Sequence, residues 1–105
     1  MSREVEPRAA AALIAEGALA VDVRDAAELE EDGYLEGAQH VPLVELSARA
    51  GELPAGRPLV LICRSGTRSA MAAAALHASG FEAYSVGGGI LAWQRDGLPV
   101  ARINP

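Results

Sequence analysis

The chain contains one cysteine, Cys63, and the residues that follow it could make that thiol a nucleophile. The segment combines two arginines with a glycine and reads Cys63, Arg64, Ser65, Gly66, Thr67 and Arg68. Cations and backbone N–H groups at a helix N-terminus favour a cysteine thiolate, which is the reactive form. We therefore predict that Cys63 is catalytic and that residues 64–68 form an anion cradle that binds the substrate.

The rest of the composition narrows the chemistry that Cys63 could perform. One cysteine allows neither an intramolecular disulfide nor a cysteine-rich metal site. His40 and His77 do not have metal-ligand spacing with it, so we expect no metal and no cofactor. All nine basic residues are arginine, which removes lysine Schiff bases and the P-loop lysine from consideration.

The predicted secondary structure places Cys63 between a strand and a helix. Residues 58–62 form a short, continuous apolar run, typical of a central strand covered on both faces. Residues 68–79 are rich in alanine and predict a helix that ends at Gly80. Further strands are expected at 19–23, 39–41 and 81–86, and further helices at 7–16, 26–32, 43–50 and 90–96.

This alternation of strands and helices predicts an α/β fold with a mainly parallel sheet in three layers. Ligands bind such sheets beyond the carboxyl ends of the strands, which is where Cys63 is expected to lie. Asp22 and Arg24 end a neighbouring strand on the same edge, and we expect an ion pair there that braces the active loop. The glycines at 87–89 should let the last crossover pass close to that loop.

Two other groups of side chains are given structural roles. Trp93 is expected in the core. Five acidic residues are expected to form a solvated face, which could also meet a basic partner: Glu28, Glu30, Glu31, Asp32 and Glu36.

Length and charge limit the classes of partner. A chain of 105 residues predicts one domain spanning 1–105. Nine basic and fourteen acidic residues give a net charge of −5, which argues against nucleic acid or an anionic membrane as partner. No run approaches the ~18 apolar residues of a membrane span, and the segment 1–7 lacks the apolar core of a signal peptide, so we expect a cytoplasmic location.

The chain resembles the rhodanese family over most of its length. The residues that carry the resemblance are Val21-Asp22-Val23-Arg24 with Glu28, the stretch 37–46, the loop 63–69, Gly80-Phe81, Gly87-Gly88, Ala92-Trp93 and 97–100. The resemblance implies a five-stranded sheet flanked by helices and a cysteine that alternates between thiol and persulfide. The chain departs from the family pattern at Tyr34, where a histidine is common, and at Glu36, where a proline is common.

The function expected from this resemblance is sulfur transfer by double displacement. Cys63 would attack the outer sulfur of thiosulfate or a similar anionic donor, and the persulfide would pass to cyanide, a small thiol or a protein thiol. The loop amides and Arg64 would hold the charge of the donor, and Arg68 would stabilise the persulfide.

Two alternatives stay open at this point. The chain could be a sulfur carrier or sensor module that a partner protein persulfidates. It could also be a phosphatase or arsenate reductase, because cell-cycle control phosphatases share the fold and a catalytic cysteine loop. Those enzymes place five residues between cysteine and arginine, whereas four lie between Cys63 and Arg68, so the cradle here should be smaller.

Overall fold

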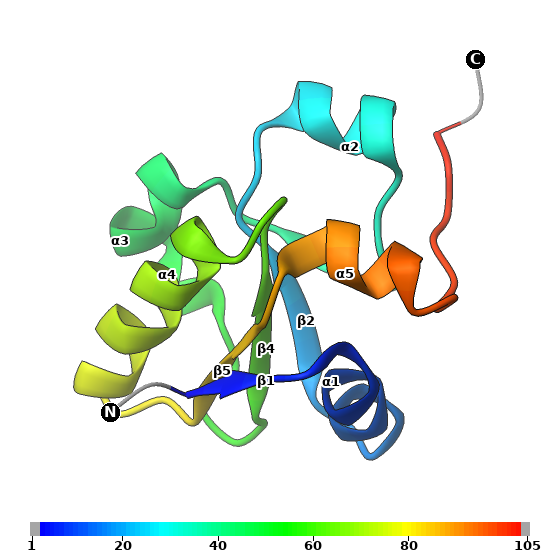
Figure 1. Cartoon of the computed structure of the whole chain (residues 1–105). Helices are drawn as coiled ribbons and strands as arrows, with labels where there is room; N and C mark the ends of the chain where they lie inside the picture. Colours follow the sequence, from blue (N-terminus) through cyan, green and yellow to red (C-terminus); the bar gives the residue numbers. More distant parts are fainter. Residues whose placement is uncertain (1–2, 104–105) are drawn as a thin grey trace.

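The fold is built around one parallel β-sheet, seen in a computed structural model that describes residues 3–103. Met1 and Ser2, which begin the segment judged to lack a signal-peptide core, lie outside the described residues. The five strands are ordered β1-β5-β4-β2-β3 and every pairing between them is parallel (Figure 1). Their bounds are β1 Glu4–Val5, β2 Leu19–Asp22, β3 Gln39–His40, β4 Leu59–Ile62 and β5 Ala83–Val86.

Helices cover both faces of this sheet. One face carries α1 (Pro7–Ala15) and α5 (Gly89–Arg95), and the other carries α3 (Leu46–Arg49) and α4 (Thr67–Ala78). The remaining helix, α2 (Ala26–Asp32), lies beyond the carboxyl ends of the strands and has no fully buried residue (Figure 1). The expected three-layer α/β arrangement is therefore confirmed, and α2 stands apart from its layers.

The central strand β4 shows why the sequence folds this way. All four of its residues are buried, as its continuous apolar run predicted. Because side chains alternate along a strand, Leu59 and Leu61 face α3 and α4, whereas Val60 and Ile62 face α1 and α5. This burial on both sides fixes the position of the residue that comes next, Cys63.

The structure differs from the sequence prediction in two elements. The edge strand β1 was not predicted, because it has two residues, neither of them fully buried, and pairs with β5 far along the chain. The prediction of one continuous helix at 43–50 was wrong. The segment forms a 3₁₀ turn (Leu43–Glu45), the single-turn α3, and a second 3₁₀ turn (Ala50–Glu52).

The segment after α2 is tied to the C-terminal part of the chain. Tyr34 and Ala101 exchange two backbone hydrogen bonds, of 2.9 and 2.7 Å, and form an isolated antiparallel bridge. The position where the family often has a histidine is thus a backbone pairing point. Within residues 3–103, no helix has the length and apolar composition needed to cross a membrane.

Candidate active site

The loop after β4 wraps backbone N–H groups around the sulfur of Cys63. The N–H of Gly66 donates to Sγ at 3.1 Å and the N–H of Ser69, in the first turn of α4, donates at 3.3 Å. Gly66 has φ +105°, a left-handed conformation that favours glycine and turns the chain into the helix. Two backbone N–H groups thus meet at the sulfur, one from the predicted loop 64–68 and one from Ser69 just beyond it, and Cys63 is only 1% exposed. Substrate binding by residues 64–68 stays a prediction.

Two buried serines extend the polar surroundings of the sulfur. Ser69 Oγ lies 3.4 Å from Cys63 Sγ and 2.7 Å from Ser85 Oγ, and it donates to the carbonyl of Gly66 at 3.2 Å. A hydroxyl can rotate its proton, so Ser69 can accept from the thiol or donate to a sulfur anion. Neither serine was predicted as a site residue. A polar residue inside the apolar strand β5 was the available signal, since buried hydroxyls need partners.

The start of α5 presses directly against the active loop. The N–H groups of Ile90 and Leu91 donate to the carbonyls of Cys63 and Arg64 at 2.8 and 3.2 Å. A Cβ on Gly89 would lie 2.4 Å from each of those two carbonyl oxygens, so only glycine fits. This contact confirms the expectation that the glycine run brings the last crossover close to the loop.

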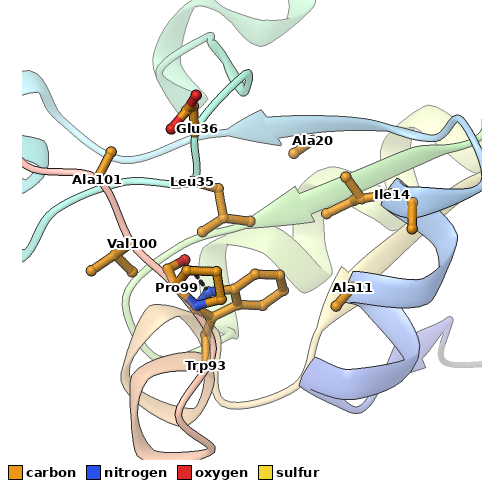
Figure 2. A pocket seen from close by; sticks show the side chains of 10 residues that line it. Ala11, Ile14, Ala20, Leu35, Glu36, Trp93, Pro99, Val100 and Ala101 are labelled. Carbon is orange, nitrogen blue, oxygen red and sulfur yellow. Dashed lines mark hydrogen bonds between the residues drawn. The ribbon is translucent and has the colours of Figure 1, made fainter.

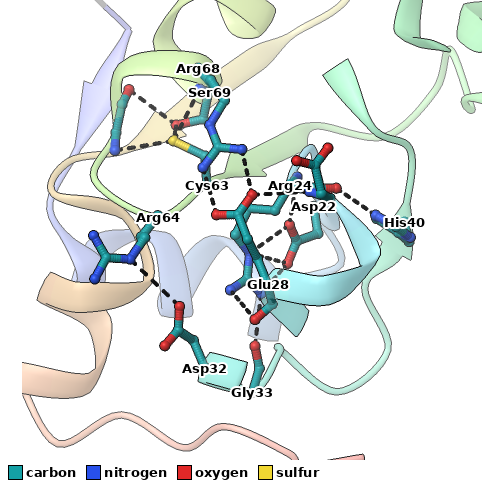
Figure 3. A network of polar contacts seen from close by, with 12 residues as sticks. Asp22, Arg24, Glu28, Asp32, Gly33, His40, Cys63, Arg64, Arg68 and Ser69 are labelled. Atoms are coloured by element: carbon teal, nitrogen blue, oxygen red, sulfur yellow. Dashed lines mark hydrogen bonds and ion pairs between the residues drawn. The ribbon is translucent and has the colours of Figure 1, made fainter. Parts of the chain in front are cut away.

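Arg68 is held by an acidic residue of α2. Its guanidinium donates two hydrogen bonds of 2.7 Å to the carboxylate of Glu28 (Figure 3). Hydrogen bonding to Arg68 lowers the pKa of Glu28 from 4.5 to about 2, and the same contact raises the pKa of Arg68. The expectation of a solvated face was wrong for Glu28, because this side chain points at the active loop.

Arg64 points outward and is more weakly held. Its Nε lies 3.6 Å from the Asp32 carboxylate, and its side chain is 54% exposed. Asp32 is also turned toward the loop, so it too departs from the expected solvated face (Figure 3). Ser65 and Thr67 are exposed residues of the same loop. Of the two loop arginines, Arg64 is thus the more exposed and the more weakly paired, whereas Arg68 is held by two hydrogen bonds to Glu28.

The ion pair expected between Asp22 and Arg24 is present and buried. Arg24 Nη2 lies 2.7 Å from the Asp22 carboxylate, and the two side chains are 0% and 1% exposed. Arg24 also donates to the carbonyls of Gly33, at 2.8 Å, and Glu28, at 3.5 Å. The pair therefore braces α2 against β2, and its support reaches the active loop through the Glu28 carboxylate.

A separate hollow lies between α1, α5 and the segment 99–101 (Figure 2). Its lining is mostly apolar and includes Ile14, Leu35 and Trp93, with Glu36 among the few polar residues. Trp93 is 5% exposed, which confirms its expected place in the core, and its Nε1 donates to the Pro99 carbonyl at 2.8 Å. This hollow brings together no predicted site residue.

Comparison with known proteins gives one consistent family. A model of the rhodanese-like domain matches residues 6–96. The chain is 40% identical over 86 residues to a sulfurtransferase of Allochromatium vinosum, covering 81% of this chain and 79% of that protein. It is 38% identical over 95 residues to the thiosulfate sulfurtransferase GlpE of Pseudomonas fluorescens, covering 88% and 84%. A solved rhodanese-related protein of Thermoplasma volcanium has a TM-score of 0.87 at 30% identity, covering 93% and 96%.

Proposed function

This chain belongs to the rhodanese-like domain family, and on that premise we propose that it transfers a sulfane sulfur from thiosulfate or a similar anionic donor through a persulfide on Cys63. The main observation behind the proposal is the environment of the Cys63 sulfur. At the carboxyl end of β4, this sulfur accepts hydrogen bonds from the backbone N–H groups of Gly66 and Ser69. Such a cradle stabilises negative charge on sulfur both before and after transfer.

The first half-reaction forms the persulfide. The Cys63 thiolate attacks the outer sulfur of thiosulfate, an S–S bond forms, and the S–S bond of the donor breaks as sulfite leaves with the electron pair. Arg64, as the exposed cation of the loop, is placed to attract the anionic donor. The Ser69 hydroxyl, 3.4 Å from Sγ, can donate to the thiolate before it attacks.

The second half-reaction returns the thiolate. Cyanide or an acceptor thiolate attacks the outer sulfur of the persulfide, and the Cys63 thiolate is the leaving group. With cyanide the product is thiocyanate. The first step ends with negative charge on the outer sulfur of the persulfide, and the second returns it to Cys63 Sγ, where the N–H groups of Gly66 and Ser69 donate to the thiolate.

Titration of the purified protein with thiosulfate, followed by cyanide, tests the proposal. Intact mass spectrometry should show one added sulfur atom that cyanide removes as thiocyanate, and Cys63→Ser should acquire none. An adduct that survives in Cys63→Ser would sink the proposal. Persulfide formation without turnover would identify a sulfur carrier, and efficient aryl phosphate hydrolysis would instead support a phosphatase.

A further inference from the structure

The two arginines of the active loop meet two carboxylates of one helix. Glu28 and Asp32 are four residues apart in α2 and so lie on the same face. Arg64 and Arg68 are likewise four residues apart in the loop, and each pairs with one of these carboxylates (Figure 3). Two carboxylates of α2 therefore each pair with one arginine of the active loop.

The two ion pairs differ in the distance between their charged groups and in how exposed each arginine remains. Glu28 and Arg68 share two hydrogen bonds of 2.7 Å, and their side chains are 20% and 32% exposed. Asp32 and Arg64 approach to 3.6 Å, beyond hydrogen-bond distance, and Arg64 is mostly exposed. An incoming anion can therefore engage Arg64 more easily than Arg68.

The backbone of Asp32 is held in place although its ion pair is weak. The side-chain amide of Gln94, in α5, donates to the Asp32 carbonyl oxygen at 2.7 Å. The next residue, Gly33, receives a hydrogen bond of 2.8 Å from the buried Arg24. These anchors fix the backbone of Asp32, so its carboxylate stays within reach of Arg64 and its charge acts on a donor that engages Arg64.

The geometry points to Asp32 as a specificity-determining residue that sets how much negative charge the site accepts in a sulfur donor. A dianion such as thiosulfate must share Arg64 with this carboxylate and is repelled by it, whereas a donor with at most one negative charge is repelled less. This inference rests on the proposed sulfur transfer. It adds that Asp32 lowers the kcat/KM of the wild-type protein for thiosulfate more than for organic persulfides.

Steady-state kinetics of Asp32→Asn with two donors and cyanide as acceptor test the inference. With thiosulfate, we expect kcat/KM to rise about two- to fivefold, the range for an exposed charge pair, and the gain should shrink as salt is added. With the persulfide of 2-mercaptoethanol, the change should stay below about half of that gain. An equal rise with both donors, or no rise with thiosulfate, overturns the inference.

Glu30→Gln is the matched control, because it removes the same charge from the same helix. At 3.6 residues per turn, Glu30 lies roughly 200° from Glu28 and Asp32 around α2, and its side chain is exposed. This variant should use both donors like the wild type. An increase in thiosulfate use equal to that of Asp32→Asn would show a general charge effect and overturn the role assigned to Asp32.

A second measurement needs no sulfur transfer. Iodoacetate and iodoacetamide both alkylate a thiolate with loss of iodide, but only iodoacetate carries a negative charge. The ratio of their rates at Cys63 should rise about two- to fivefold in Asp32→Asn and stay unchanged in Glu30→Gln. An unchanged ratio in Asp32→Asn overturns the inference. A raised ratio in a protein that takes no sulfur from any donor would leave the charge selectivity standing and remove the proposed function instead.

Discussion

The active-site end of the sheet and the α1–α5 face are held together by different forces. Around Cys63 the structure relies on close backbone approaches and short polar contacts, such as Gly89 against the Cys63 carbonyl and Glu28 against Arg68. Around Trp93 it relies on apolar packing, with one side-chain hydrogen bond from the indole to the Pro99 carbonyl. The first region fixes the positions of single atoms, whereas the second supplies free energy of folding. Substitutions in the first region should therefore impair sulfur transfer, with or without a loss of stability, whereas substitutions in the second should impair stability alone.

The largest effect is expected for Gly89→Ala in the first region. The new Cβ would lie 2.4 Å from two backbone oxygens, which cannot move away as a side chain can, and the residue would keep φ +61°. We expect the free energy of unfolding to fall by about 4 kcal/mol or more, the range of exceptional single substitutions, and sulfur transfer to fall at least about a hundredfold. Urea unfolding and thiosulfate:cyanide kinetics measure the two effects.

Gly97→Ala separates this clash from backbone strain. Gly97 also has positive φ, +78°, but a Cβ there would meet nothing within 4 Å. Strain alone should cost about 1 to 2 kcal/mol and leave sulfur transfer unchanged. If the two variants lost equal stability, the contact between Gly89 and the active loop would not be the reason for glycine.

Trp93→Ala, in the second region, should lower stability without lowering sulfur transfer. Loss of this buried side chain should lower the free energy of unfolding by about 3 to 4 kcal/mol. The kcat/KM measured well below the melting temperature should stay within about twofold of wild type, because Trp93 packs in the core cluster of one face of the sheet and Cys63 in that of the other. Trp93→Phe keeps much of the volume and should recover most of the stability. A large loss of kcat/KM in the folded Trp93→Ala protein would break the proposed division.

Features of the active-site end that follow from local sequence patterns could be predicted, whereas those that depend on tertiary contacts could not. The strand β4 and the helix α4 follow from local patterns, an apolar run and an alanine-rich segment, so the place of Cys63 between them was predictable. The partner of Arg68 was not, because Glu28 is 40 residues away and reaches it through the docking of α2. That docking depends on Arg24 bonding the Gly33 carbonyl, a tertiary contact without a periodic signal.

Arg64→Ala should have an intermediate effect that is confined to the active-site end. Charge-assisted contact with a partly exposed anion contributes roughly 1 to 3 kcal/mol, or about one to two decades in kcat/KM with thiosulfate. The loss should shrink with added salt and should be smaller with a monoanionic persulfide.

Arg57→Ala provides the control for Arg64. It removes the same charge from the segment before the amino end of β4, at the end of the sheet opposite to Cys63. It should leave kcat/KM for thiosulfate near the wild-type value. Equal losses with both donors in Arg64→Ala would mean that Arg64 shapes the loop and does not recognise charge.

Glu28→Gln should have the smallest effect and should appear mainly as a change in pH dependence. In the folded protein the hydrogen bonds from Arg68 hold the pKa of Glu28 at about 2, below its ordinary value of 4.5. A carboxylate whose pKa is lower in the folded state stabilises the protein above its unfolded pKa, and this stabilisation is lost as the pH falls toward the folded value. Because the pair is partly exposed, we expect a contribution of about 1 kcal/mol near neutral pH.

Urea unfolding of the wild type and Glu28→Gln between about pH 7 and pH 2.5 measures this contribution. The difference in free energy of unfolding should be about 1 kcal/mol above pH 5 and should shrink as Glu28 is protonated in the unfolded wild type. Glu30 is exposed on the same helix, so Glu30→Gln should leave the pH dependence of the free energy of unfolding as it is in the wild type. A difference that stayed constant down to pH 2.5 would show that Glu28 stabilises α2 by packing and would remove the charged contact with Arg68 from the features that distinguish the active-site end.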